Sequence, residues 1–319
     1  MHRLESVQAL RGVAVLFVVL SHVGFINFGA FGVDLFFCIS GFIMMYITQK
    51  STDNFFYKRV IRIIPLYWAM TISTFILVSF KPSLLNSTSS ELSHLIKSIA
   101  FIPFDKNGLI EPLLGPGWTL NYEMYFYLIF YLSLKISFEY RGYITSSIFG
   151  ILALVGLFYD GDLIWGFYTD PIILEFTFGI LAFYILKSKV KFNKITSIFI
   201  IFFVLFICIF TRIKPLPDLR FLIWGVPMLV FFILFVMNDY HFYSRGLLEK
   251  IGNASYSIYL THLFIILGFD RLLSPMQSLS LSSLLLSMVA VTSSIIFGYF
   301  VYKWFEVPVH RYFAVRVKN

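Results

Sequence analysis

The chain has 319 residues, of which 59% are hydrophobic and only 13% charged, and its mean hydropathy is +0.83. Soluble domains are about half apolar and a quarter charged, so this composition excludes an ordinary water-soluble protein. No polar stretch is long enough for a separate aqueous domain, which predicts a single transmembrane domain over residues 1–319 with no separate soluble domain. The net charge of +8 comes from Lys and Arg scattered between apolar runs, a pattern that signals membrane topology and no nucleic-acid partner.

Neither the cysteines nor the N-terminus indicates a secreted protein. Cys38 and Cys208 both lie inside apolar runs, where a thiol behaves as a small hydrophobe and a disulfide framework has no use. The first apolar run carries Arg11 and His22 and lacks a small-residue cleavage site, so we expect it to remain as the first helix.

Hydropathy predicts an all-α integral membrane protein built as a bundle of about ten transmembrane helices. The predicted spans are Val7–Ile26, Val33–Gln49, Ile64–Phe80, Thr119–Lys135, Ile144–Phe158, Ile172–Leu186, Ile195–Phe210, Phe221–Val236, Ala254–Phe269 and Ser283–Phe305. Most Lys and Arg outside these spans fall on the side of the N-terminus, which predicts that both termini are cytoplasmic. The longest connection, 81–118, then faces outward, and its segment 90–104 is expected to lie as an amphipathic helix on the membrane surface.

Charged and ionisable side chains within a span are costly and therefore candidates for function. Arg11 and His22 lie on one face of the first span, about 16 Å apart along its axis. This separation is comparable with the reach of a phosphopantetheine arm. The alternative is structural: Arg11 extends to the inner headgroups, and His22 bonds a neighbouring helix.

Two carboxylates are expected at the outer depth of His22. Asp34 opens the second span after a short turn, so it is predicted to lie near His22 and to orient this imidazole as a general base. The alternative for Asp34 is to bind free amides at a helix start, which is common. Glu123 lies one turn into the fourth span, among tyrosines, and Glu175 near the start of the sixth span is a weaker candidate.

On the inner side, the segment YKRVIRIIP places Arg59 and Arg62 three residues apart on one face of a helix end. Two guanidinium groups in this arrangement suit a phosphate. By charge alone, an ordinary positive-inside anchor is the better explanation of these arginines.

Aromatic and polar residues near the outer side are candidates for substrate contact, although His262 near mid-membrane also suits simple helix packing. The substrate-binding candidates are Trp118, Tyr122, Glu175, Tyr256 and His262. No zinc signature, phosphate-binding loop or nucleophile elbow occurs in the sequence, so no metal is expected and ATP-driven or serine-hydrolase chemistry lacks support.

Five motifs, in order along nearly the whole chain, make the sequence resemble the integral-membrane acyltransferase 3 family, whose members O-acylate cell-surface and exported polysaccharides in bacteria. The motifs are VQALRGVAVLFVVLSHV, GVDLFFCISGFIM, FYKRVIRIIPLYW, GPGWTLNYEMYFY and SYSIYLTHL. The resemblance implies a catalytic His22, the involvement of Arg11, an acyl-coenzyme A contact at Arg59 and Arg62, and Glu123 at the active centre. In layout the chain looks most like stand-alone exopolysaccharide acetyltransferases, because it lacks the extra helix and exported domain of longer members.

These observations predict an enzyme of the bacterial inner membrane that uses acetyl-coenzyme A, or another acyl-coenzyme A, as co-substrate. The acceptor is a polysaccharide or lipid-linked oligosaccharide, and direct transfer and an acetyl-imidazole intermediate remain equally open. A flippase or transporter of a lipid-linked sugar, with His22 and Asp34 binding the sugar or coupling protons, is the alternative. An inactive membrane scaffold is a third hypothesis.

Overall fold

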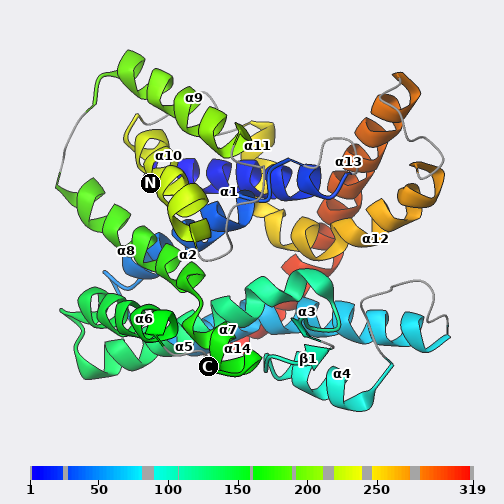
Figure 1. The fold of residues 1–319 in the computed structure, drawn as a ribbon, viewed down its shortest axis with the longest axis horizontal. Helices are drawn as coiled ribbons and strands as arrows, with labels where there is room; N and C mark the ends of the chain where they lie inside the picture. The colour runs from blue at the N-terminus through cyan, green and yellow to red at the C-terminus, as the bar shows by residue number, and fades with distance from the viewer. Residues whose placement is uncertain are drawn as a thin grey trace. The chain divides into compact units, whose positions relative to one another are not determined.

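The computed structural model describes residues 2–23, 28–80, 90–106, 108–158, 161–188, 192–210, 219–238, 246–273 and 281–316. The chain divides into two compact units. Unit 1 comprises Met1–Tyr46 and Phe178–Trp304, and unit 2 comprises Ile47–Thr177 and Phe305–Asn319. Figure 1 traces the elements of both units from the blue N-terminal helix to the red C-terminal one.

Unit 1 is helical over its described residues. Its helices are α1 (His2–Ser21), α2 (Gly32–Ile47), α9 (Lys194–Phe210), the π-helical turn η5 (Phe221–Gly225), α10 (Val226–Met237), α11 (Leu247–Asn253), α12 (Ser255–Leu273) and α13 (Leu281–Val301), with most of α8 (Leu174–Lys187). Helix α1 packs on α11 and α12, α9 packs on α10, and α12 lies against α13 (Figure 1).

Two glycines allow α1 and α11 to cross at backbone contact. A Cβ atom on Gly12 would lie 2.4 Å from the carbonyl oxygen of Leu248, and one on Gly252 would lie 1.8 Å from that of Gln8. Real Cβ atoms do not approach other atoms this closely, so both positions require glycine. Small residues at a crossing are the usual way in which membrane helices bring their backbones together.

Unit 2 contains a second set of helices and one small hairpin. Its elements are α3 (Phe55–Phe80), α4 (Leu92–Ile99), β1 (Asp105–Lys106), β2 (Leu109–Ile110), the 3-10 turn η2 (Gly115–Gly117), α5 (Trp118–Ile136), α6 (Arg141–Phe158), α7 (Leu163–Thr169), the 3-10 turn η3 (Pro171–Ile173) and α14 (Val307–Arg316). Strands β1 and β2 are antiparallel, with Asp105 opposite Ile110.

Helices α3 and α5 run antiparallel, which determines which of their side chains meet. The ring of Phe55 lies 5.5 Å from that of Phe130, and twelve residues later Tyr67 lies against Gly117. The first half of α3 therefore faces α5 in reverse order, from Phe130 back to its start, and the rest of α3 extends beyond the start of α5.

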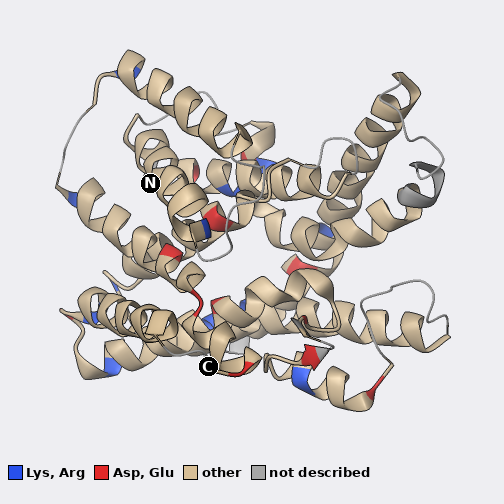
Figure 2. Cartoon of the chain, in the orientation of Figure 1, with Lys and Arg blue, Asp and Glu red and all other residues tan. Residues whose placement is uncertain are grey.

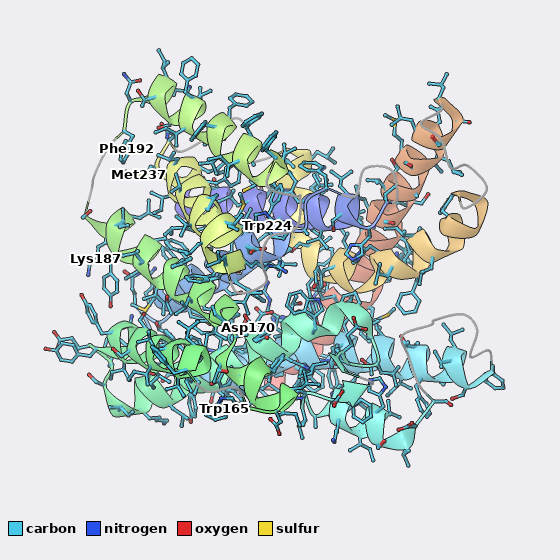
Figure 3. All side chains as sticks on the ribbon, viewed as in Figure 1. Trp165, Asp170, Lys187, Phe192, Trp224 and Met237 are labelled. Carbon is cyan, nitrogen blue, oxygen red and sulfur yellow. The ribbon has the colours of Figure 1, made fainter. Side chains whose placement is uncertain are left out.

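Aspartates begin the short helices that follow α6. The carboxylate of Asp162 accepts a hydrogen bond of 2.8 Å from the backbone N–H of Trp165, and that of Asp170 accepts one of 2.8 Å from Ile172. Both bonds satisfy amides that have no partner within the helix. Trp165 and Asp170 are labelled in Figure 3.

Each of the ten predicted spans overlaps a helix within its described residues, so the predicted all-helical class is confirmed. Residues 24–26 of the first predicted span lie outside the described residues. Among the described residues, four helices are long and apolar enough to cross a membrane: Phe55–Phe80, Arg141–Phe158, Leu163–Lys187 and Leu281–Phe313. A fifth is possible if Leu247–Asn253 and Ser255–Phe269, which meet at an 82° bend, form one broken span. The number of ten crossings stays a prediction.

One boundary needs correction: α3 begins at Phe55, whereas the predicted third span began at Ile64. The hydropathy window excluded Arg59 and Arg62 because it counts their charge without knowing their neighbours. In the structure these neighbours include a tyrosine and a glutamate of α5.

The outer surfaces are apolar, as expected for contact with lipid. On α9, Phe199 is 69% exposed and Phe203 is 63% exposed. Figure 2 shows that Lys, Arg, Asp and Glu are sparse along the described helices. In water this much exposed aromatic surface would drive association, so these faces favour the bilayer as solvent.

Candidate active site

Two histidines that are 240 positions apart in sequence meet in unit 1. His22 follows the last residue of α1 and is exposed, whereas His262 on α12 is 0% exposed. Nε2 of His262 lies 3.4 Å from Nδ1 of His22, and the ring centroids are 4.9 Å apart at an interplanar angle of 67°. The predicted base and a residue predicted to contact substrate are therefore direct neighbours.

Local backbone carbonyls hold both rings. Nδ1 of His22 lies 2.8 Å from the carbonyl oxygen of Val18, one turn earlier on α1, and 3.2 Å from Oγ of Ser21. Nδ1 of His262 lies 2.7 Å from the carbonyl oxygen of Tyr259. The end of α1 and the middle of α12 thus fix the orientation of the pair.

Asp34 has a different partner from the one predicted. Its carboxylate, which is 0% exposed, accepts two hydrogen bonds from Arg220, from Nη2 at 2.8 Å and from Nε at 3.2 Å. Among the described residues it makes no hydrogen bond with His22. Phe36 lies two positions further, about 200° around α2, and its ring is 5.9 Å from Tyr259, beside the histidines. Asp34 therefore occupies the opposite face of α2 from the pair.

Sequence reasoning missed Arg220, which forms the Asp34 ion pair. Its guanidinium also lies over the indole ring of Trp224, 5.1 Å from the ring centroid. The signal was present, because Arg220 directly precedes the apolar run FLIWG. The predicted span began at Phe221, which assigned the arginine to a loop.

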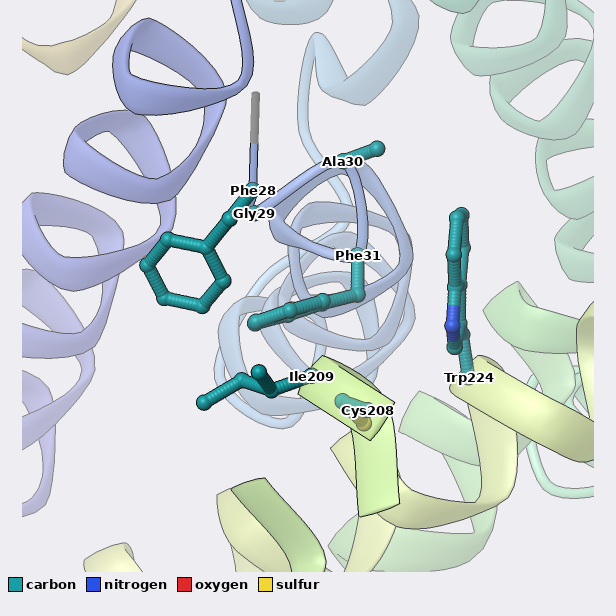
Figure 4. A pocket seen from close by; sticks show the side chains of 7 residues that line it. All are labelled: Phe28, Gly29, Ala30, Phe31, Cys208, Ile209 and Trp224. Carbon is teal, nitrogen blue, oxygen red and sulfur yellow. The ribbon is translucent and has the colours of Figure 1, made fainter. Parts of the chain in front are cut away.

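A cavity of about 180 Å³ lies in unit 1 beside this ion pair. Its walls are mainly apolar and aromatic, as Figure 4 shows, and come from Phe28, Gly29, Ala30, Phe31, Cys208, Ile209 and Trp224. Arg220 borders the cavity, because its Nη2 lies 3.5 Å from the carbonyl oxygen of Ala30. An apolar cavity of this order holds one small ring or a short aliphatic group.

A second cluster forms in unit 2 between α3 and α5, and we call Arg59, Arg62, Glu123 and Tyr127 the arginine cluster. The hydroxyl of Tyr127 donates to Oε1 of Glu123 and also bonds to Arg59. Arg59 interacts electrostatically with Glu123 and Arg62. Nε of Arg59 is buried and has no hydrogen-bond partner among the described residues, so this guanidinium retains a donor for a ligand.

The arginine cluster corrects the predicted separation of Glu123 from the arginines. The sequence placed Glu123 on the outer side and Arg59 and Arg62 on the inner side. Because α3 begins nine residues earlier than predicted and runs antiparallel to α5, these side chains are neighbours. Tyr127, which links them, follows Glu123 by one helical turn, a spacing that could have identified it.

Two further ionisable residues belong to the two units, one to each. His310 of α14 is within electrostatic reach of Arg59 and Arg62. In unit 1, Arg11 is 8% exposed in α1, with its Nη1 3.4 Å from Oε1 of Gln8. The predicted gathering of Arg11 with Arg59 and Arg62 stays a prediction.

The remaining substrate-binding candidates are largely buried. Tyr122 stacks on Phe167 at a centroid distance of 4.0 Å and meets the edge of Trp118. Glu175 is 0% exposed in the first turn of α8, and Tyr256 is 8% exposed on α12. The predicted contact of these side chains with substrate therefore requires the packing around them to open on binding. In the part of the chain that the structure describes, no group of three or more His, Cys, Asp or Glu is placed to hold a metal ion.

Comparison with known proteins identifies relatives of the whole chain. The acyltransferase 3 family model, described as an acyltransferase domain, matches residues 4–303. The exopolysaccharide production protein ExoZ of Rhizobium meliloti is 34% identical over 259 residues, which cover 75% of this chain and 77% of ExoZ.

Two longer relatives are O-acetyltransferases by name. The peptidoglycan O-acetyltransferase OatA of Listeria monocytogenes is 24% identical over 96% of this chain and 56% of its own length. The O-acetyltransferase OatA of Staphylococcus aureus is 28% identical over 82% of this chain and 50% of its own length. The chain thus spans about half the length of these two relatives. No solved structure matches the chain.

Proposed function

Since the chain belongs to the acyltransferase 3 family, we propose that it is a membrane-bound O-acyltransferase. It moves an acetyl or other short acyl group from cytoplasmic acyl-coenzyme A to a hydroxyl of a surface or exported polysaccharide. The names of ExoZ, an exopolysaccharide production protein, and of the Listeria OatA, a peptidoglycan O-acetyltransferase, support a glycan acceptor. A lipid-linked oligosaccharide is the membrane-bound form of such an acceptor.

The arginine cluster is the observation that supports the donor. Coenzyme A carries phosphates, and two guanidinium groups one turn apart give the planar donors that phosphate oxygens accept. Tyr127 and Glu123 hold Arg59, while its buried Nε has no partner in the part of the chain that the structure describes. Arg11 is a further proposed contact for acyl-coenzyme A.

His22 is the proposed general base. Its exposed imidazole takes the proton of a sugar hydroxyl as the hydroxyl oxygen bonds to the thioester carbonyl carbon. The carbon–sulfur bond then breaks, and the coenzyme A thiolate recovers the proton from His22. Glu123 acts through Tyr127 and Arg59, and Asp34 acts through the ion pair that anchors the start of α2. The sequence alone predicts substrate contacts at Trp118, Tyr122, Glu175, Tyr256 and His262.

The proposed setting is a single domain of about ten spans in the bacterial inner membrane, with both termini cytoplasmic. The apolar helices over all ten predicted segments support this arrangement. Arg59 and Arg62 then approach the cytoplasmic face, where acyl-coenzyme A is available.

The test is an acyl-transfer assay with purified protein, labelled acetyl-coenzyme A and bacterial surface glycan. We expect labelled acetyl ester on the glycan, detected by mass spectrometry, and one coenzyme A thiol released per ester. His22→Ala should abolish both products while leaving the thermal unfolding midpoint close to that of the unaltered protein. Movement of a sugar lipid across vesicles without thiol release would contradict the proposal and favour a flippase.

A further inference from the structure

The hydrogen bonds around His262 determine which of its nitrogens carries a proton. Nδ1 lies 2.7 Å from the carbonyl oxygen of Tyr259. A carbonyl oxygen only accepts hydrogen bonds, so Nδ1 of His262 is the donor. The side chain is 0% exposed, and a buried unpaired charge is costly, so the ring is neutral. Its Nε2, which faces His22, therefore presents a lone pair.

Three acceptors surround Nδ1 of His22. They are the carbonyl oxygen of Val18 at 2.8 Å, Oγ of Ser21 at 3.2 Å and Nε2 of His262 at 3.4 Å. The Ser21 hydroxyl gives its own proton to Val18, at 2.7 Å, so its oxygen also acts as an acceptor towards His22. A lone pair on Nδ1 of His22 would face three other lone pairs, which is unfavourable. A proton on Nδ1 can instead be donated to these acceptors as a hydrogen bond.

We infer that His262 is a positioning residue that keeps the proton of His22 on Nδ1 and leaves Nε2 as its basic nitrogen. The inference rests on the proposed function, in which His22 is the general base. Among the described residues, Nε2 of His22 makes no hydrogen bond, so its lone pair is available to a substrate hydroxyl.

This arrangement gives a neutral imidazole the orienting role that a carboxylate has in hydrolase triads. When Nε2 of His22 takes the hydroxyl proton, the resulting imidazolium keeps its Nδ1 proton and donates it to Val18 and His262. The same Nε2 proton then passes to the coenzyme A thiolate as the carbon–sulfur bond breaks. Asp34 has no part in this orientation, because Arg220 holds its carboxylate.

Kinetics of two variants test the role of His262. His262→Phe retains a ring of similar size but removes the acceptor, and His262→Gln places a carboxamide near the position of imidazole Nε2. We expect kcat to fall about tenfold in the Phe variant, as the loss of one hydrogen bond predicts, and to recover in large part in the Gln variant. The KM values for donor and acceptor should not change. Thr261→Val, at a buried neighbouring position on α12, is the matched control and should retain full activity.

Two kinetic results would overturn the inference. A raised KM for the acceptor with unchanged kcat would make His262 a substrate contact, as the sequence alone predicted. Equal losses in the Phe and Gln variants, at equal thermal unfolding midpoints, would mean that the acceptor atom is irrelevant.

The tautomer itself is measurable without substrate or variants at position 262. In protein labelled with ¹⁵N-histidine, the His22 resonances are identified by their loss in His22→Gln. We expect the ¹⁵N chemical shift of Nδ1 to be that of a protonated imidazole nitrogen and the shift of Nε2 to be that of an unprotonated one. The reverse pattern would overturn the inference. This measurement does not depend on whether His262→Phe folds. The expected tautomer in a protein without acyl transfer would contradict only the proposed function. Acyl transfer with the reverse tautomer would contradict only the inference.

Discussion

Arg59 combines a firmly held guanidinium with a buried Nε that no described residue hydrogen-bonds. If it binds a phosphate of acyl-coenzyme A, Arg59→Lys keeps the charge but loses the planar pair of donors. We expect the KM for the donor to rise about tenfold or more, because hydrogen bonds to charged groups contribute about 1.5–3 kcal/mol. The KM for the glycan should be unchanged. Steady-state kinetics with each substrate varied in turn measures both.

Lys58→Gln is the control for this change. Lys58 is the adjacent cation on α3, exposed, and donates to the backbone carbonyl of Asp53 at 2.9 Å. We expect its loss to leave both KM values unchanged, since it lies outside the arginine cluster. Equal effects of the two variants would indicate that only the total positive charge matters, as in a topology anchor.

The ion pair of Asp34 and Arg220 predicts a stability effect that is separate from catalysis. Asp34→Asn leaves a guanidinium without its counter-charge, and breaking a fully buried pair costs about 3–5 kcal/mol. Because the Arg220 side chain is 23% exposed, solvent reduces this cost, and we expect about 2 kcal/mol. Thermal unfolding in detergent measures the loss.

A double variant separates this structural role from a catalytic one. Asp34→Asn combined with Arg220→Gln removes both charges, so we expect the double variant to be more stable than Asp34→Asn alone. If acyl transfer recovers together with stability, Asp34 acts only through the ion pair. A stable double variant without activity would instead support the catalytic role that the sequence predicted for Asp34.

Among the helices, the crossing of α1 and α11 depends on backbone contact at Gly12 and Gly252. Gly252→Ala places a Cβ atom where the carbonyl of Gln8 lies, so the helices must separate. We expect a loss of several kcal/mol, on the order of that for overpacked cores, and a fall in acyl transfer because both histidine-bearing helices move. Thermal unfolding and activity should decline together.

Gly268→Ala on α12 is the matched control. A Cβ at Gly268 meets nothing within 4 Å, and alanine favours helix over glycine by about 1 kcal/mol. We expect unchanged activity and equal or higher stability. If Gly252→Ala behaves like this control, the crossing does not determine the position of the histidines.

Hydropathy is sufficient to find helices here, because the bilayer requires long apolar segments and the sequence supplies them. It failed at the start of α3, where Arg59 and Arg62 continue the helix because α5 provides partners. The pairing of Asp34 with Arg220 and of His22 with His262 was beyond a single sequence, since it depends on which helix faces pack together. The predicted Asp34–His22 contact assumed that adjacency in sequence decides the partner.

For the whole molecule, the proposed topology predicts that donor and acceptor approach from opposite sides of the membrane. In proteoliposomes with uniformly oriented protein, labelled acetyl-coenzyme A supplied at the Arg59 face should acetylate an impermeant glycan at the opposite face. Supplying both at the Arg59 face should give little product. The reason is that the distance of about 16 Å from Arg11 to His22 along the helix suits a pantetheine arm and excludes a bulky glycan.

A matched experiment with the protein in the reverse orientation controls for leakage. Donor and acceptor should then each be required on the side of the vesicle opposite to the one required before. Efficient transfer with both substrates confined to the Arg59 face would mean that the glycan is acetylated in the cytoplasm and exported afterwards.

The crossing glycines also limit which insertions and deletions the protein can accept. His22 lies ten residues after Gly12 on α1, and His262 lies ten residues after Gly252 across the break between α11 and α12. One residue added to a helix rotates everything beyond it by about 100° and shifts it by about 1.5 Å. A single insertion in either ten-residue interval would turn one imidazole away from the other, while substitutions there leave the spacing intact. Functional relatives should therefore vary in residue type across both intervals but keep their length.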